Sequence, residues 1–308
     1  MSDISDIARP DPAPPPFLLR PPVGAPKCVV FAVPHSGRYY PPALVKNAAL
    51  TPHNLRLCED AYVDHLFSEA PGFGAALLVA THARSYLDLN RAENELDPMM
   101  FSPTLDTGAL YISHRVKAGL GTIPKQVAEG LNIYDAPLPQ REAWQRIDTI
   151  HKPYHTRLRS LVDARRRQFG HAILIDCHSM PSEGGSGRGR TSLPGPDIVL
   201  GDCWGTACGR ELASMAEEML VRAGFSVRRN VPYAGGFVTQ HYGSPGNNVH
   251  ALQIELNRAL YMDEETIEPH DGFGDVQERL TRFMADFTRN AAQAFPDRTP
   301  GALPRAAE

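Results

Sequence analysis

The sequence has little that would cross-link the chain or attach it to a membrane. Its five cysteines are odd in number and scattered without a CxxC pair, so we expect neither a disulfide framework nor a structural zinc ribbon. No apolar run approaches the roughly 20 residues that span a bilayer. The first residues lack the basic start and apolar core of a signal peptide. These absences predict a cytoplasmic protein with reduced thiols.

A large excess of charge of either sign is also missing. The 308 residues include 31 Lys and Arg against 35 Asp and Glu, which gives a formal net charge of −4. Such a chain has no basic face to attract nucleic acid and no polybasic anchor for a membrane. We therefore expect neither nucleic acid nor membrane as a partner, and the oligomeric state stays open.

Composition predicts one folded unit between two tails. Residues 1–26 are rich in proline and are expected to form a flexible tail. Residues 27–296 would form a single domain, and residues 297–308 a loose C-terminal tail. The Pro- and Gly-rich stretch 181–196 is expected to be a loop beside the active site. It is not expected to bind a phosphate, because it lacks the GxxxxGK[ST] spacing.

Strand and helix patterns alternate along the folded unit. Such alternation predicts an α/β fold with a mainly parallel sheet. In these sheets ligands bind at the carboxyl ends of the strands. Short β-branched runs predict strands over residues 27–33, 75–80, 172–175, 197–200 and 251–254, and apolar spacing predicts helices over 55–70, 140–169, 206–223 and 275–294.

Three polar residues follow three of the predicted strands. His35, His178 and Glu255 would meet in one crevice if their strands are neighbours. Histidine and carboxylate are the ligands of catalytic zinc sites, which use three protein ligands and leave a position for water. A single histidine after a strand is more often structural, but three such residues together leave the two readings evenly balanced.

A further carboxylate ligand could come from residues 59–64. Asp60 and Asp64 are four apart, so on a helix they would share one face, where one could bind metal and the other orient a ligand. An ordinary solvated helix face is the alternative. Asp176 shares a strand face with His178 and could support it, whereas Cys177 points the other way and is expected in the core.

Two arginines lie just after the second predicted strand. The guanidinium fork matches a carboxylate, so Arg84 and Arg91 near the crevice would select an acidic substrate. The alternative is a pair of surface arginines that form ion pairs with nearby acids, namely Glu93, Glu95 or Asp97.

Taken together, five motifs in this order resemble the N-formylglutamate amidohydrolase family. The resemblance covers roughly residues 28–290. Its motifs are Pro34-His35-Ser36-Gly37, Glu59-Asp60 through Asp64, Asp88-Leu89-Asn90-Arg91, Asp176-Cys177-His178-Ser179 and Gln253 through Arg258, with residues 232–237 and 242–245 in addition.

The resemblance implies a fold and an activity. The fold would be a mixed, mainly parallel sheet flanked by helices, like that of the zinc-dependent exopeptidases (phosphorylase/hydrolase-like), with one catalytic domain over residues 27–296. The activity would be zinc-dependent hydrolysis of a small acidic acyl amino acid. N-formyl-L-glutamate, split into formate and L-glutamate in histidine catabolism, is the leading substrate.

The resemblance also implies roles for individual residues. Relatives of the exopeptidase type carry an HxxE motif, but position 38 here is Arg38, so the carboxylate ligand must come from elsewhere. The implied metal ligands for one Zn²⁺ are His35, Asp60 and His178, with Asp64 in reserve; the catalytic residues are Glu255 as general base and Arg84; the substrate-binding residues are Asn90, Arg91, Arg258 and Ser36.

Other functions on the same scaffold stay open at this point. A zinc carboxypeptidase or another N-acyl amino-acid deacylase would use the same ligands. A non-catalytic protein could use the crevice to bind an acidic metabolite. Cobalt or manganese could replace zinc.

Overall fold

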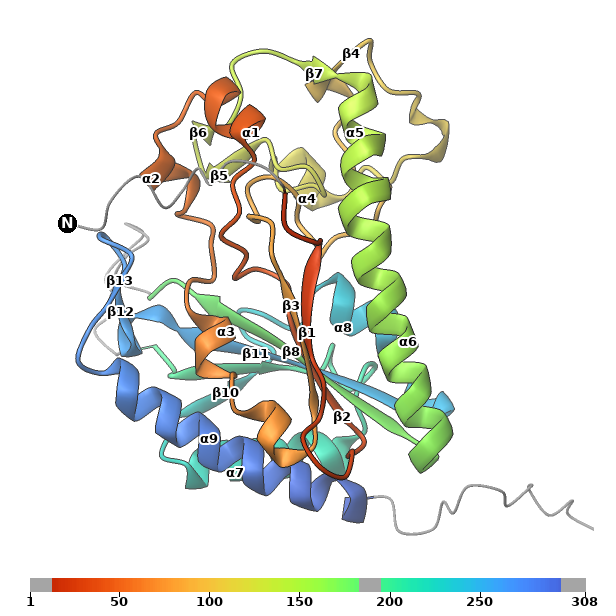
Figure 1. The fold of residues 1–308 in the computed structure, drawn as a ribbon, viewed down its shortest axis with the longest axis vertical. Coiled ribbons are helices and arrows are strands. Elements are labelled where there is room, and N and C mark those ends of the chain that lie inside the picture. Colours follow the sequence, from red (N-terminus) through yellow and green to blue (C-terminus); the bar gives the residue numbers. More distant parts are fainter. Residues whose placement is uncertain (1–12, 183–194, 295–308) are drawn as a thin grey trace, which may run out of the picture.

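A computed structural model describes residues 13–182 and 195–294 of the chain. Most of the predicted loop over 181–196 and the predicted C-terminal tail lie outside these residues. Figure 1 shows a central sheet with helices packed on both of its faces. Among the described residues, no helix is both long and apolar enough to cross a membrane. All five cysteines lie in the described ranges and are free thiols, as predicted.

The central sheet has seven strands, and its middle four run parallel. At one edge β1 is antiparallel to β3. Toward the other edge β9 is antiparallel to β11, and the edge strand β10 is parallel to β9. The prediction of a mixed, mainly parallel sheet is therefore confirmed. In spatial order the strands are β1 (Phe17–Arg20), β3 (Ala76–Ala80), β2 (Val29–Val33), β8 (Ala172–Met180), β11 (Val249–Asn257), β9 (Ile198–Gly201) and β10 (Val227–Arg229).

The strand β1 corrects the prediction of a flexible tail over residues 1–26. Residues 17–20 pair with β3, and the half-buried side chains of Phe17 and Leu19 pack against the core. This short apolar segment lies next to several prolines, so composition alone could not distinguish it from a tail. Residues 1–12 lie outside the described part of the chain.

The alternation of side chains along the strands builds two cores. Phe31 on β2 faces one core, while its neighbours Val30 and Ala32 face the other. The first core is covered by α3 (Val63–Leu66), α7 (Arg210–Arg222) and α9 (Phe273–Asn290); the second by α5 (Gln140–Arg146), the π-helical segment Ile147–His151, α6 (Lys152–Phe169) and α8 (Phe237–Tyr242).

The helix predicted over residues 55–70 does not form. Only α2 (Pro52–Leu55) and α3 are helical there, and Tyr62 has a left-handed backbone with φ of 64°. Asp60 lies in the loop before α3, where its backbone N–H donates to the carbonyl of His35 at 3.0 Å. This contact across the chain outweighs local helical spacing. The prediction that Asp60 and Asp64 share one helix face is therefore wrong.

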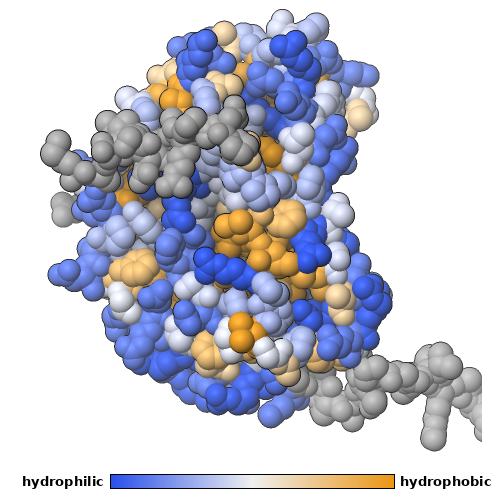
Figure 2. Space-filling view, in the orientation of Figure 1, coloured by the Kyte–Doolittle hydropathy of each residue, from blue (hydrophilic) through white to orange (hydrophobic). Residues whose placement is uncertain are grey.

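A smaller cap of short elements lies beyond the carboxyl ends of the parallel strands (Figure 1). It has its own apolar cluster, which includes Tyr40, Leu44 and Ile133. Figure 2 shows a mostly hydrophilic surface, with an apolar area over β1, where Leu18 is half exposed. The short elements of the cap include α1 (Pro42–Asn47), β4 (Phe101–Ser102), α4 (His114–Lys117), β5 (Gln126–Ala128), β6 (Leu131–Asn132) and β7 (Leu138–Pro139). The strands β12 (Met262–Asp263) and β13 (Glu268–Pro269) pair with each other outside the cap.

Candidate metal centre and active site

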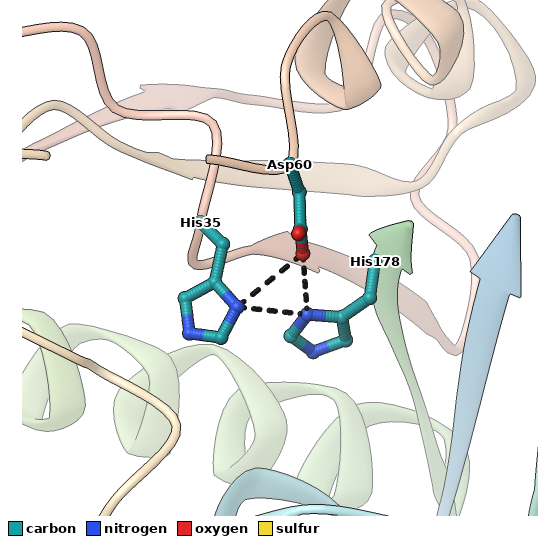
Figure 3. A group of neighbouring side chains, drawn as sticks. All are labelled: His35, Asp60 and His178. Carbon is teal, nitrogen blue, oxygen red and sulfur yellow. Dashed lines mark hydrogen bonds and ion pairs between the residues drawn. The ribbon is translucent and has the colours of Figure 1, made fainter. Parts of the chain in front are cut away.

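Three buried side chains converge where the cap meets the sheet. The Nδ1 atoms of His35 and His178 lie 3.1 Å apart, and Asp60 Oδ2 lies 3.3 Å from the first and 3.0 Å from the second. Figure 3 shows the three groups pointing toward one another from two loops and a strand. Each residue is at most 3% exposed, so the groups meet away from bulk water.

The local structure fixes each of the three residues. His178 lies on β8, which is longer than predicted, whereas His35 follows the end of β2. The next glycine, Gly37, passes so close to the cap that an added Cβ would stand 2.1 Å from the carbonyl oxygen of His82. Ser36 donates its hydroxyl to the carbonyl of Asp60 at 2.7 Å. Ser36 is buried and absent from the cavity lining, and its hydroxyl positions Asp60; its role in substrate binding stays a prediction.

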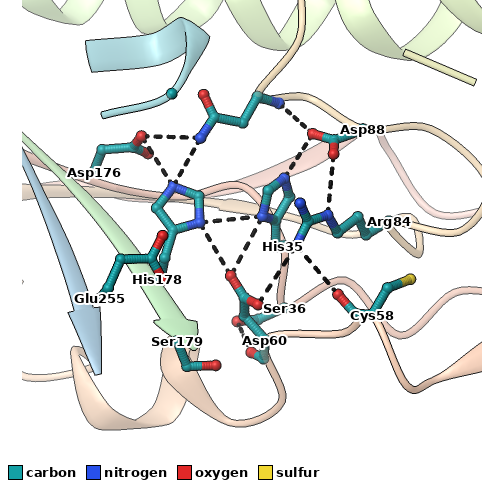
Figure 4. A network of polar contacts seen from close by, with 12 residues as sticks. His35, Ser36, Cys58, Asp60, Arg84, Asp88, Asp176, His178, Ser179 and Glu255 are labelled. Atoms are coloured by element: carbon teal, nitrogen blue, oxygen red, sulfur yellow. Dashed lines mark hydrogen bonds and ion pairs between the residues drawn. The ribbon is translucent and has the colours of Figure 1, made fainter. Parts of the chain in front are cut away.

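The Nε2 atom of each histidine, on the side of the ring away from Asp60, contacts the carboxylate of another aspartate. His35 Nε2 lies 2.8 Å from Asp88 Oδ1, and His178 Nε2 lies 2.9 Å from Asp176 Oδ2 (Figure 4). Asn90 Nδ2 also lies 3.2 Å from His178 Nε2. Carboxylates in this position orient metal-binding histidines, because they fix the proton on the nitrogen that faces away from the metal.

This arrangement places three acceptors against one another. With the Nε2 protons of His35 and His178 directed at Asp88 and Asp176, both Nδ1 lone pairs face the Asp60 carboxylate. Lone pairs and a negative charge repel unless a cation or a proton lies between them. Ligands of a tetrahedral ion with bonds of about 2.0–2.2 Å lie roughly 3.3 Å apart. The donor set therefore fits a divalent metal ion.

The pKa shifts of His178 and Asp60 also fit a site for a cation. Burial alone would lower the pKa of His178, but Asp176 and Asp60 hold that pKa well above its ordinary value. Burial would raise the pKa of Asp60, but the His178 and His35 rings that contact its carboxylate hold it well below the ordinary range. The site thus keeps a carboxylate charged and draws positive charge toward it.

Asp64, the alternative carboxylate ligand, lies elsewhere. Its Oδ2 forms an ion pair with Arg38 Nη2 at 2.7 Å. Among the described residues, the group of side chains that can share a metal ion is His35, Asp60 and His178. Arg38, which stands where the HxxE motif has its glutamate, thus forms an ion pair with Asp64, the carboxylate that lies outside the cluster.

Glu255 stands beside the cluster on a neighbouring strand. It is the register partner of His178 in the parallel pair β8 and β11, so both side chains leave the same face of the sheet. Gln253 Nε2 donates to Glu255 Oε1 at 2.8 Å. Burial raises the pKa of Glu255 to about 7, opposed by the nearby charge of His178. A carboxyl group with a pKa near neutrality suits general acid–base catalysis.

The cluster opens into a cavity of about 470 Å³. His35, Asp60, His178 and Glu255 line it, together with residues of the cap such as Arg115 and Gln126. A volume of this size is typical of sites for small molecules.

Comparison with known proteins identifies the family and the fold. Residues 27–262 match the family model of N-formylglutamate amidohydrolase. The chain belongs to that family. It is 30% identical over 249 residues to an N-formylglutamate deformylase of Pseudomonas putida, which covers 77% of this chain and 82% of the relative. A deformylase of Pseudomonas aeruginosa is 30% identical over 247 residues, which cover 77% of this chain and 83% of the relative.

A solved structure resembles the whole fold. The crystal structure of N-formylglutamate amidohydrolase from Ralstonia eutropha JMP134 is 34% identical and superposes with a TM-score of 0.85 over 91% of this chain and 99% of that one. The predicted family and the prediction of a hydrolase are thereby confirmed. The protein is an amidohydrolase, and every residue of the cluster lies within the matched range.

In this amidohydrolase the predicted arginines all line the cavity, and each is held by a neighbour. Arg84 Nε donates to Asp88 Oδ2 at 3.0 Å, and Arg258 Nη2 donates to Asp60 Oδ1 at the same distance. Arg91 donates to the backbone carbonyl oxygens of Asn90 and Leu120. The ion-pair partners of these arginines are site carboxylates, so the alternative of surface pairs with the acids at 93–97 is wrong.

The amidohydrolase cavity contains residues that the sequence did not single out. Arg115 comes from the short helix α4, and Gln253, on β11, begins the motif that contains Glu255 but received no role of its own. Tyr233 lies in a segment that supports the family resemblance but received no role. The alternation of side chains could have identified Gln253, two residues before Glu255. Nothing in the sequence around Arg115 indicates that α4 faces the cavity.

Proposed function

We propose that this amidohydrolase cleaves N-formyl-L-glutamate with water to give formate and L-glutamate, and that the reaction requires a divalent metal ion, with Zn²⁺ as the favoured ion. The observation that carries the proposal is the convergence of two Nδ1 lone pairs and a carboxylate oxygen beside Glu255 in a cavity rich in arginine. The names of the Pseudomonas and Ralstonia relatives support the choice of substrate.

The metal would be held by His35, Asp60 and His178. A bound Zn²⁺ supplies Lewis acidity, which lowers the pKa of water to about 7 and polarises a carbonyl group. Nitrogen and oxygen ligands favour Zn²⁺, although Co²⁺ or Mn²⁺ could replace it. Asp88 and Asp176 keep the two imidazole rings oriented through their Nε2 atoms.

Glu255 would act as the general base and then as the general acid. Because Gln253 already donates to Oε1, the other oxygen, Oε2, is the one that takes a proton from the attacking water. It then delivers this proton to the amino nitrogen of the departing glutamate. The pKa of about 7 allows both transfers near neutral pH.

The arginines would balance the negative charges of the substrate. Arg84 keeps its Nε on Asp88, and its Nη1 lies 3.8 Å from Asp60 Oδ1, so its guanidinium stands next to the cluster. A donor here stabilises the oxyanion that develops on the formyl oxygen, an effect worth roughly 3–4 kcal/mol. Asn90, Arg91 and Arg258 complete the polar wall for the carboxylates of the substrate.

Formate release from N-formyl-L-glutamate tests the proposal. The zinc-loaded protein is expected to release formate, a chelated sample to stop, and added Zn²⁺ to restore the rate. N-acetyl-L-glutamate and a dipeptide with C-terminal glutamate serve as comparison substrates. Faster cleavage of either one would move the function to another deacylase or to a carboxypeptidase.

A further inference from the structure

One arginine of the cavity has no charged partner among the residues that the structure describes. Arg84 and Arg91 lie within 4 Å of Asp88, and Arg84 and Arg258 within 4 Å of Asp60. Within residues 13–182 and 195–294, the side chain of Arg115 makes neither a hydrogen bond nor an ion pair. It is half-buried and lines the same cavity.

Hydrogen bonds hold α4, the helix that carries Arg115, to the loop that contains Asp88 and Asn90. Ser113 Oγ caps α4 by accepting from the backbone N–H groups of Arg115 and Val116 at 3.1 Å, and it also donates to Glu95 Oε1. Beyond the helix, Leu120 accepts the Arg91 Nε–H at 2.8 Å. The backbone that carries Arg115 is thus tied to the loop that carries Asp88 and Asn90.

The charge of Arg115 reaches into the cavity. Burial lowers the pKa of Arg91, and the positive charges of Arg84 and Arg115 lower it further. Burial raises the pKa of the Cys203 thiol to about 11, and Arg115 opposes that change. Arg115 therefore adds positive charge to the cavity lining, and within the described residues no carboxylate forms an ion pair with it.

We propose that Arg115 binds the side-chain carboxylate of the substrate and thereby determines the preference for an acidic acyl amino acid. This inference rests on the proposed function and assigns one part of the substrate to one residue. Arg84 and Arg258 contact Asp60 and so lie next to the scissile bond, close to the α-carboxylate. The side-chain carboxylate is farther from that bond, and among the described residues Arg115 is the cavity arginine that pairs with neither Asp60 nor Asp88.

A substrate with a neutral side chain would leave the charge of Arg115 unpaired inside the cavity. The guanidinium fork forms paired, charge-assisted hydrogen bonds with a carboxylate, and an amide of the same shape offers a weaker match. Discrimination between N-formyl-L-glutamate and N-formyl-L-glutamine should therefore depend on Arg115.

The test compares Arg115→Met with Arg115→Lys and with the matched control Lys117→Met, an exposed residue on the same helix. For N-formyl-L-glutamate, Arg115→Met should lower kcat/KM by roughly 10- to 100-fold, mainly through KM, as expected for loss of a charged hydrogen-bonded pair. For N-formyl-L-glutamine its kcat/KM should stay within about threefold. Arg115→Lys should recover part of the loss, and Lys117→Met should match the wild type.

Glutarate binding to the metal-loaded proteins gives a readout that needs no turnover. Calorimetry should show weaker binding to Arg115→Met than to the wild type and to Lys117→Met. Equal losses of kcat/KM on both substrates, or unchanged glutarate affinity, would overturn the assignment of Arg115. Absence of formate release by the wild type would contradict the proposed function instead, and the glutarate comparison would still decide whether Arg115 binds a dicarboxylate.

Discussion

Glu255 and His178 are direct partners in the parallel register of β11 and β8, two strands that share nine paired positions. The backbone of two long, buried strands therefore sets the spacing between the candidate base and a candidate metal ligand. Both side chains can be changed conservatively without disturbing that backbone.

Glu255→Gln should abolish turnover without loss of metal. The amide keeps the shape of the side chain but cannot accept the proton from water, so we expect kcat to fall by about 10²- to 10⁴-fold. Formate release and metal content by mass spectrometry should be measured on the same sample. A variant that retained most of its rate would show that another group is the base.

Asp60→Asn should lose the metal. The substitution removes the charge that faces both Nδ1 atoms and weakens the bond to Arg258, so a lower thermal midpoint is also expected. Asp64→Asn is the matched control, because Asp64 pairs with Arg38 outside the cluster. The assignment would be refuted by Asp64→Asn losing the metal while Asp60→Asn kept it.

Asp176→Asn should weaken metal binding without abolishing it. Asp176 contacts the Nε2 of His178 and lies outside the three candidate ligands, so its loss affects the orientation and basicity of that ring. Such substitutions typically reduce metal affinity by about 10- to 100-fold. Competition with a chromogenic chelator measures the change. An affinity equal to that of the wild type would mean that the Asp176 carboxylate is not needed to orient His178.

Stability should fall as the pH drops from about 6.5 to about 4, in part because of His82. Burial lowers the pKa of His82 to about 4 in the folded protein. Between that value and the ordinary pKa of about 6.5, the unfolded chain binds a proton that the folded chain does not. The stability is therefore fully present above pH 6.5. We expect this residue to contribute roughly 1–3 kcal/mol to the loss.

Urea unfolding at pH 7.5 and pH 5 measures this dependence. His82→Gln should show a smaller drop between the two pH values than the wild type, whereas the exposed His53→Gln should show the same drop. Part of the slope should remain, because burial also lowers the pKa of His151 and His155. An unchanged slope in His82→Gln would exclude His82 as a source.

The sequence allowed prediction of those parts of the site that lie on strands. His178 and Glu255 continue apolar runs, so their position at the carboxyl end of the sheet follows from the pattern alone. The position of Asp60 does not follow, because it is set by the bond from its backbone N–H to His35 and by the left-handed Tyr62. Arg115 is brought to the cavity by contacts of the cap, which have no periodic signal in the sequence.

The edge strand β1 has a consequence for protein engineering. Deleting residues 1–26 as a dispensable tail would strip β3 of its antiparallel neighbour and uncover a row of unpaired backbone donors and acceptors. Exposed edges of this kind recruit strands from other molecules, so the shortened chain should aggregate where the full chain does not. A shortened form that keeps residues from 13 onward would retain β1 and the protection that it gives.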